Sequence, residues 1–150
     1  MQMTNSSKEH QREKLLDALN LNMNEELRAT FQYICHRIAA HPTNRVLAES
    51  FKTAALDEMT HILYFSDLLS KYGGSPSFHE WPVDKSTDLK TMLATDLQLE
   101  KEAKIRYTDH IERFKAFEDV MIVLQDNLPG LHVQAGVELG VSLEGGGNRF

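Results

Sequence analysis

The segment Asp57-Glu58-Met59-Thr60-His61 lies within a long helical pattern and places a carboxylate and an imidazole on the face expected to be buried. Residues three apart share a helix face, so Glu58 and His61 point the same way. The apolar side chains of that face are Phe51, Ala54, Ile62 and Phe65. An unpaired charge among them is very costly, so the carboxylate needs a compensating partner, and a metal ion is one candidate.

Two more carboxylates occupy similar positions on other expected helices. Glu26 lies within a face formed by Leu15, Leu19, Met23, Thr30 and Tyr33, and Glu100 within one formed by Leu89, Leu93, Tyr107, Ile111 and Phe114. Each lies about halfway along its helix, so these glutamates can meet Glu58 and His61 at one depth. Alone, Glu58 and His61 are more simply explained as a buried ion pair or hydrogen-bonded pair. With Glu26 and Glu100 added, a site for iron, manganese or zinc is favoured.

Four helical patterns predict an all-α four-helix bundle. They cover residues 11–40, 44–72, 88–115 and 118–128, with Val120, Met121, Leu124 and Leu128 facing inward on the last. Residues 1–10 are expected to form a flexible tail, and Thr43 is expected to cap the second helix. Pro129 and Gly130 interrupt the fourth pattern, so residues 129–150 are expected to form an irregular glycine-rich tail.

A long connection between the second and third helices sets the topology. Residues 73–86 can span about 46 Å when extended, whereas a helix over 44–72 is about 43 Å long. The connection is therefore long enough to return along the whole second helix. We expect a long crossover, with the third helix parallel to the second.

The first two helices each carry a second apolar stripe on the back. These stripes consist of Leu27, Phe31, Ile34 and Ile38 on the first helix, and Leu56, Met59 and Leu63 on the second. A helix that is apolar on two sides is usually buried on two sides. We therefore expect the chain to be a homo-oligomer built from a two-fold dimer.

Composition narrows the remaining function classes. The net charge of −6 argues against general binding of nucleic acid. No apolar run approaches the length of a membrane span, and the polar N-terminal residues do not resemble a signal peptide. The single cysteine, Cys35, excludes an internal disulfide and a Cys-x-x-Cys metal site, and it fits a reducing cytoplasm.

Three segments resemble the bacterioferritins of the ferritin-like superfamily. Residues 24–33, NEELRATFQY, resemble their first-helix segment, with a metal-binding glutamate and a tyrosine seven residues later. Residues 57–61, DEMTH, resemble their second-helix Glu-x-x-His, and residues 96–100, DLQLE, resemble their third-helix segment. The similarity covers about residues 11–128. One glutamate from each of two helices plus Glu-x-x-His from each of the others is the di-metal pattern of such bundles.

This resemblance implies a ferroxidase-like function, in which Fe(II) is bound, oxidised by O₂ or peroxide, and stored or detoxified. Glu58 would bridge two irons, Glu26 and Glu100 would be terminal ligands, and His61 would complete one iron. Tyr33 would act beside the site as an electron donor or by supporting a ligand. In bacterioferritins a methionine at the place of Met59 ligates haem between two subunits, although packing at a dimer contact is the simpler role for this side chain.

The sequence departs from the family on the fourth helix. Residues 126–132, DNLPGLH, contain no glutamate three residues before a histidine, and His132 is out of register. The di-iron site is therefore expected to be incomplete. Two alternatives stay open: a rubrerythrin-like peroxide reductase, against whose full-length form the missing Cys-x-x-Cys counts, and a non-catalytic dimeric bundle that binds haem or no cofactor.

Four other polar residues are expected to stay outside the site. Asp96 precedes Glu100 by one helical turn and is expected to be solvated or to support a ligand. His110 is expected at the rim, and His36 at an edge without a ligand. Tyr107 is expected to be an ordinary core tyrosine.

Overall fold

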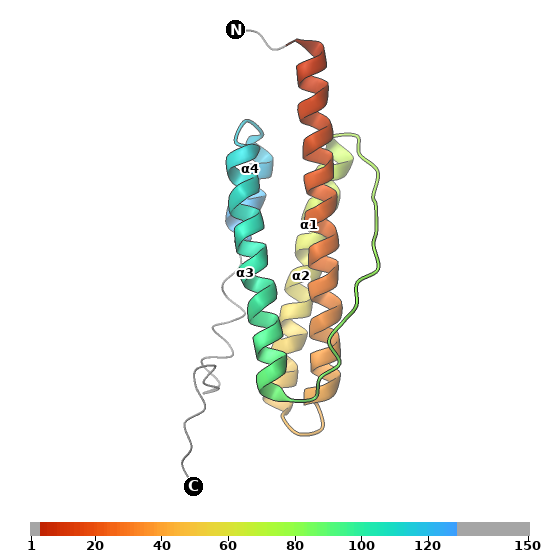
Figure 1. Ribbon diagram of the computed structural model, residues 1–150, viewed down its shortest axis with the longest axis vertical. Helices are drawn as coiled ribbons and strands as arrows, with labels where there is room; N and C mark the ends of the chain where they lie inside the picture. Colours follow the sequence, from red (N-terminus) through yellow and green to blue (C-terminus); the bar gives the residue numbers. More distant parts are fainter. Residues whose placement is uncertain (1–3, 129–150) are drawn as a thin grey trace.

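The computed structural model describes residues 4–128, which form an all-α bundle. Its helices are α1 (Asn5–Ala40), α2 (Arg45–Lys71), α3 (Leu89–Arg113) and α4 (Glu118–Asp126). Helix α2 runs antiparallel to α1, and the long crossover returns along α1, so α3 runs parallel to α2 (Figure 1). The four-helix bundle and its crossover are therefore as the sequence predicts.

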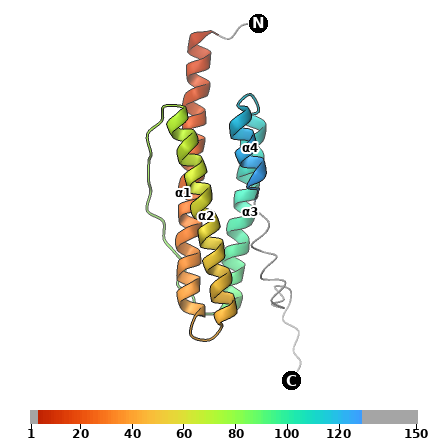
Figure 2. The ribbon, with the colours of Figure 1, turned by 180° about the vertical axis from the view of Figure 1, so that it is seen from behind.

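Helix α1 begins earlier than the sequence analysis expects. The side chain of Thr4 caps it by accepting a hydrogen bond from the backbone amide of Ser7 at 3.3 Å. Residues 5–10 are therefore helical and not part of a tail, and this end of α1 projects beyond the other helices (Figures 1 and 2). The expected glycine-rich tail at 129–150 lies outside the described residues.

The ends of α2 and the start of α3 follow ordinary capping chemistry. Asn44, and not Thr43 as expected, caps α2 by accepting from the amide of Leu47 at 3.0 Å, and Asp88 caps α3 through the amide of Thr91 at 2.9 Å. After α2 the chain turns through Gly73, whose φ of 72° is a conformation that side chains with a Cβ rarely adopt.

Three amide side chains of α1 hold the crossover against the bundle. Each donates one hydrogen bond to the crossover backbone and accepts another from it. The pairs are Asn20 with Ser75 and Ser77, Asn24 with Ser77 and His79, and Gln32 with Asp84. Arg28 adds a fourth contact on the same face by lying over the ring of Trp81. The connection is thus fixed along α1, as Figures 1 and 2 both show.

The apolar core has two parts, one on each side of a polar layer. One part includes Leu15, Leu19, Met23, Phe65, Tyr107 and Leu124, and the other includes Tyr33, Leu47, Phe51, Ala55, Leu93 and Leu99. Glu26, Glu58 and Glu100 lie between these two parts along the chain. On α4, Val120 and Leu124 are buried as expected, whereas Leu128, expected to face inward, lies beyond the end of α4 and is 40% exposed. The polar layer therefore has apolar packing above and below it.

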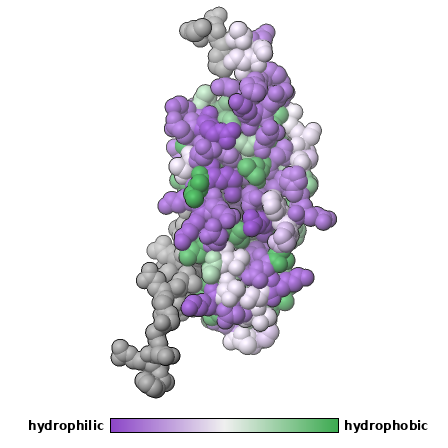
Figure 3. Space-filling view, in the orientation of Figure 1, coloured by the Kyte–Doolittle hydropathy of each residue, from purple (hydrophilic) through white to green (hydrophobic). Residues whose placement is uncertain are grey.

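The apolar stripes on the backs of α1 and α2 face outward. Their members Phe31, Ile34, Ile38, Leu56, Met59 and Leu63 are 40–68% exposed. By contrast, the face seen in Figure 3 is mainly hydrophilic, with small separate apolar areas. None of the helices within residues 4–128 combines the length and apolar character needed to cross a membrane.

Candidate metal centre

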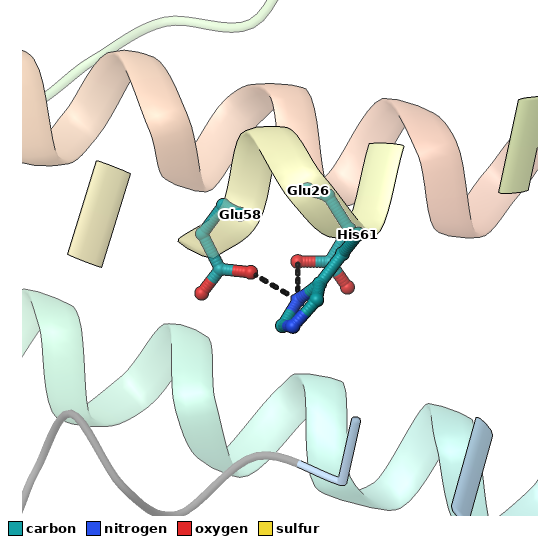
Figure 4. A group of neighbouring side chains, drawn as sticks. All are labelled: Glu26, Glu58 and His61. Carbon is teal, nitrogen blue, oxygen red and sulfur yellow. Dashed lines mark hydrogen bonds and ion pairs between the residues drawn. The ribbon is translucent and has the colours of Figure 1, made fainter. Parts of the chain in front are cut away.

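Glu26 of α1 and Glu58 and His61 of α2 converge in the polar layer (Figure 4). Their ligand atoms lie within 4.8 Å of one another, a grouping of three such side chains not repeated elsewhere in residues 4–128. Nδ1 of His61 lies 2.8 Å from Oε2 of Glu58 and 4.0 Å from Oε2 of Glu26. The three-residue spacing of Glu58 and His61 thus places both on one face, as the sequence predicts, and brings Glu26 to meet them.

Both carboxylates are almost fully buried, with Glu26 3% and Glu58 4% exposed. Burial raises the pKa of Glu58 well above its usual range, and the nearby charge of Glu26 adds to this, against the hydrogen bond with His61. Burial alone would lower the pKa of His61, but its interactions with Glu26 and Glu58 outweigh burial and raise it to about 10. Without metal this site therefore retains protons near neutral pH, and a bound metal ion would take their place.

Two buried tyrosines link α1 and α3 across the polar layer. Tyr33 of α1 donates a 2.6 Å hydrogen bond to Oε1 of Glu100 on α3, and Tyr107 of α3 donates one to Oε1 of Glu26 on α1. Burial raises the pKa of both phenols well above the usual value, so both stay protonated and act as donors. Tyr107, expected to be an ordinary core residue, therefore contacts a candidate ligand directly.

Glu100 shares a cavity with the other three candidate ligands. The cavity has a volume of about 290 Å³ and is lined by all four of these side chains, with Arg106 of α3 and Asp126 and Asn127 at the end of α4. Glu100 is not one of the three tightly grouped ligands. The structure thus brings the four candidate ligands to one cavity but gathers three of them at one point.

A model of the ferritin-like domain family matches residues 16–122, which is most of the chain. The chain belongs to the ferritin-like family. No protein of curated function matches it at a significant level.

Solved structures agree with this ferritin-like fold. Bacterioferritin BfrA of Mycobacterium tuberculosis has a TM-score of 0.72 and 20% identity, over 93% of this chain and 87% of that one. A mycobacterial bacterioferritin gives 0.73 and 22%, over 93% and 86%. A ferritin-like diiron-carboxylate protein of Bacillus anthracis gives 0.70 and 22%, over 87% and 94%. The likeness covers 87–93% of this ferritin-like chain.

Two buried histidines were not recognised from the sequence. His36 is fully buried and not at an edge: its Nδ1 lies 2.9 Å from Oδ1 of Asp96, and its Nε2 lies 2.8 Å from Nε2 of Gln32. Asp96 is 7% exposed, so the expectation that it is solvated is wrong. His110 is 3% exposed and not at a rim, and its Nδ1 lies 3.0 Å from Nδ2 of Asn22. His36 lies three residues after the buried Tyr33, a spacing that could have indicated its burial.

Met59 lies outside the polar layer, on the back of α2. It is 53% exposed, between Leu56 and Leu63 of the same outward stripe. Its neighbour Glu58 points into the bundle. The two functions expected of this segment, metal binding and haem binding, would therefore take place on different faces of α2, about 100° apart.

Proposed function

We propose that this ferritin-like chain binds iron between Glu26, Glu58, His61 and Glu100 and oxidises Fe(II) for storage or detoxification. The observation that carries the proposal is the meeting of two buried carboxylates and an imidazole within 4.8 Å. Carboxylate and imidazole ligands suit iron. Buried acids of like charge are costly together, and a divalent ion offsets that cost. The residues present therefore fit the metal.

The side chains around the centre have distinct roles in this proposal. Glu58 is the candidate bridging ligand, because it is grouped with Glu26 and His61 and lines the same cavity as Glu100, while His61 completes one metal position. Tyr33 and Tyr107 orient the carboxylates of Glu100 and Glu26 by donating to one oxygen of each. Tyr33 is also the candidate electron donor, because it contacts a proposed ligand. Bound iron would supply the redox chemistry towards O₂ or peroxide.

Replacement of Glu58 tests the proposal. Glu58→Ala should abolish tight binding of Fe(II) and fast oxidation while the helical circular-dichroism spectrum is kept. Glu102→Ala, which removes a half-buried carboxylate of α3 that contacts Arg28, is the matched control and should retain both properties. Equal iron content and equal oxidation rates in the two variants would overturn the assignment of the site.

We also propose that the exposed apolar stripes of α1 and α2 bind a second copy of this chain. Six large apolar side chains that stay 40–68% exposed on two adjacent helices form a surface that soluble monomers rarely present. Phe31→Glu should therefore convert oligomers to monomers by light scattering. Ile105→Glu is the control, because Ile105 is 73% exposed on α3, outside the stripes. A monomeric wild-type protein at micromolar concentration would contradict the proposal.

Haem binding is a second candidate function, favoured by the position of Met59 in the exposed stripe. Thioether sulfur is a known axial ligand of haem iron. Reconstitution with haem should then give a methionine-ligated spectrum that Met59→Ala removes. Absence of haem uptake would leave Met59 as a packing residue of the dimer contact.

Metal content and native mass, measured together, also separate the alternative functions. They distinguish iron storage in a large assembly from a peroxide reductase and from a metal-free dimeric bundle.

A further inference from the structure

Arg106 of α3 places a guanidinium group beside the candidate ligand Glu26. Its side chain is only 13% exposed, and its Nη2 lies 3.5 Å from Oε1 of Glu26, while Nη1 lies 4.0 Å from Oε2 of Glu25. The guanidinium also lies over the ring of Tyr107, 5.6 Å from its centre. A fixed positive charge here opposes the binding of any cation.

Neighbouring side chains hold Arg106 in this position. Its Nε donates a 3.0 Å hydrogen bond to Oδ1 of Asn22, and Nδ2 of Asn22 lies 3.0 Å from Nδ1 of His110. An amide nitrogen only donates, so Nδ1 of His110 is the acceptor and carries no proton. This agrees with the pKa of His110, which burial and the charges of Arg113 and Arg106 lower to about 4. Asn22 is thus fixed with its oxygen towards Arg106.

The two oxygens of Glu26 consequently have different surroundings. Oε1 accepts the hydrogen bond of Tyr107 and faces Arg106. Oε2 faces Nδ1 of His61 at 4.0 Å, on the side where Glu58 lies. A metal ion grouped with Glu58 and His61 can bind Oε2 without disturbing Arg106, but it can bind Oε1 only by displacing the hydroxyl of Tyr107 and the guanidinium of Arg106.

We propose that Arg106 is a specificity-determining residue that limits Glu26 to one metal-binding oxygen and disfavours trivalent ions more than divalent ones. The repulsion between a fixed charge and a bound ion grows in proportion to the charge of the ion. A site with this fixed charge binds a divalent ion. After O₂ or peroxide has oxidised that ion, the site releases the trivalent product more easily than a site without the charge would. This inference rests on the proposed metal site. It assigns to Arg106 the role of favouring release of the trivalent ion over its retention.

Redox-inert ions test the inference without any oxidation assay. Zn(II) replaces the divalent ion, and Ga(III), supplied as its nitrilotriacetate complex, replaces the trivalent one. Arg106→Gln should bind Zn(II) about tenfold more tightly than the wild-type protein and Ga(III) about thirtyfold more tightly, since the repulsion scales with ionic charge. Arg106→Lys keeps the charge and should stay within about threefold of wild type for both ions.

Lys104→Gln is the matched control, because it removes the same charge from an exposed position of α3 and should change neither affinity. A crystal structure of the Zn(II)-loaded wild-type protein provides a measurement that does not depend on any variant folding. It should show Oε2 alone of Glu26 on the metal, with Arg106 still beside Oε1.

The possible failures are distinguishable. If the wild-type protein binds Zn(II) but Arg106→Gln binds either ion no more tightly, the inference on Arg106 is overturned and the metal site stands. Ligation by both oxygens of Glu26 in the wild-type crystal also overturns the inference alone. If the wild-type protein binds no Zn(II) at all, the proposed site and the inference both fall.

Discussion

Tyr107 on α3 hydrogen-bonds to Glu26 on α1, so the phenol of one helix holds a buried carboxylate of another. Tyr33 makes the reciprocal contact with Glu100. In each case the tyrosine lies seven residues after the glutamate of its own helix. This crossed arrangement joins α1 and α3 through the polar layer, and it predicts a structural role for both phenols beside any metal.

Removal of the Tyr107 hydroxyl should therefore destabilise the metal-free protein. Tyr107→Phe keeps the ring but leaves Oε1 of Glu26 without its buried donor, which should cost about 1–3 kcal/mol. Urea unfolding followed by circular dichroism measures this free energy. Tyr64→Phe, at a side chain 43% exposed, should change the free energy of unfolding by less than about 0.5 kcal/mol. A Tyr107→Phe variant as stable as the Tyr64→Phe control would contradict the role given to this bond.

The buried His110 should give the protein a specific pH dependence. Its folded-state pKa is lowered to about 4 from 6.5, so the unfolded chain binds a proton between these values and the folded chain does not. His110 should therefore favour unfolding progressively as pH falls from 6.5 towards 4. The difference in unfolding free energy between pH 7 and pH 5 should be smaller in His110→Gln than in wild type. His10→Gln, at an exposed position, is the control and should show the same pH dependence of the unfolding free energy as wild type. If the pH dependence is also unchanged in His110→Gln, His110 is not neutral in the folded protein.

Asn20, Asn24 and Gln32 of α1 form a side-chain clamp on the crossover by accepting hydrogen bonds from its backbone amides. These bonds should slow hydrogen exchange of the crossover amides. The amide of Asp84 donates a 2.8 Å hydrogen bond to Oε1 of Gln32. In Gln32→Ala, hydrogen exchange at this amide should become at least about tenfold faster, because the acceptor is lost. The equivalent change at Gln98, whose side-chain amide donates to Glu102 on the exposed side of α3, should have no such effect. Equal exchange at Asp84 in both variants would show that the clamp does not protect the crossover.

Periodicity predicts those parts of the structure that depend on one helix at a time. The buried faces around Glu26, Glu58 and Glu100 follow from the 3.6-residue repeat, and the return of the crossover follows from its length. The start of α1 could not be found this way, because residues 5–10 are polar and extend past the core, where no apolar repeat marks a helix. The cap at Thr4 stabilises this first part of the helix.

Polar contacts between helices were beyond the reach of the same reasoning. His36 and Asp96 pair across α1 and α3, so neither spacing nor composition of a single helix reveals the pair. Arg106 was overlooked because a charged side chain on a helix usually faces solvent. Its contacts with Asn22 and Glu26 on the facing helix show that it is turned inward.

The most direct measurement of the central claim is a calorimetric titration of the metal-free protein with Fe(II) under nitrogen. Three ligands, Glu26, Glu58 and His61, meet at one point, while Glu100 lies in the same cavity outside that group. We therefore predict about one tightly bound iron per chain, with any second iron bound more weakly. Two equally tight irons per chain would show that ligands beyond these four complete a second position, and no tight binding at all would contradict the proposed centre.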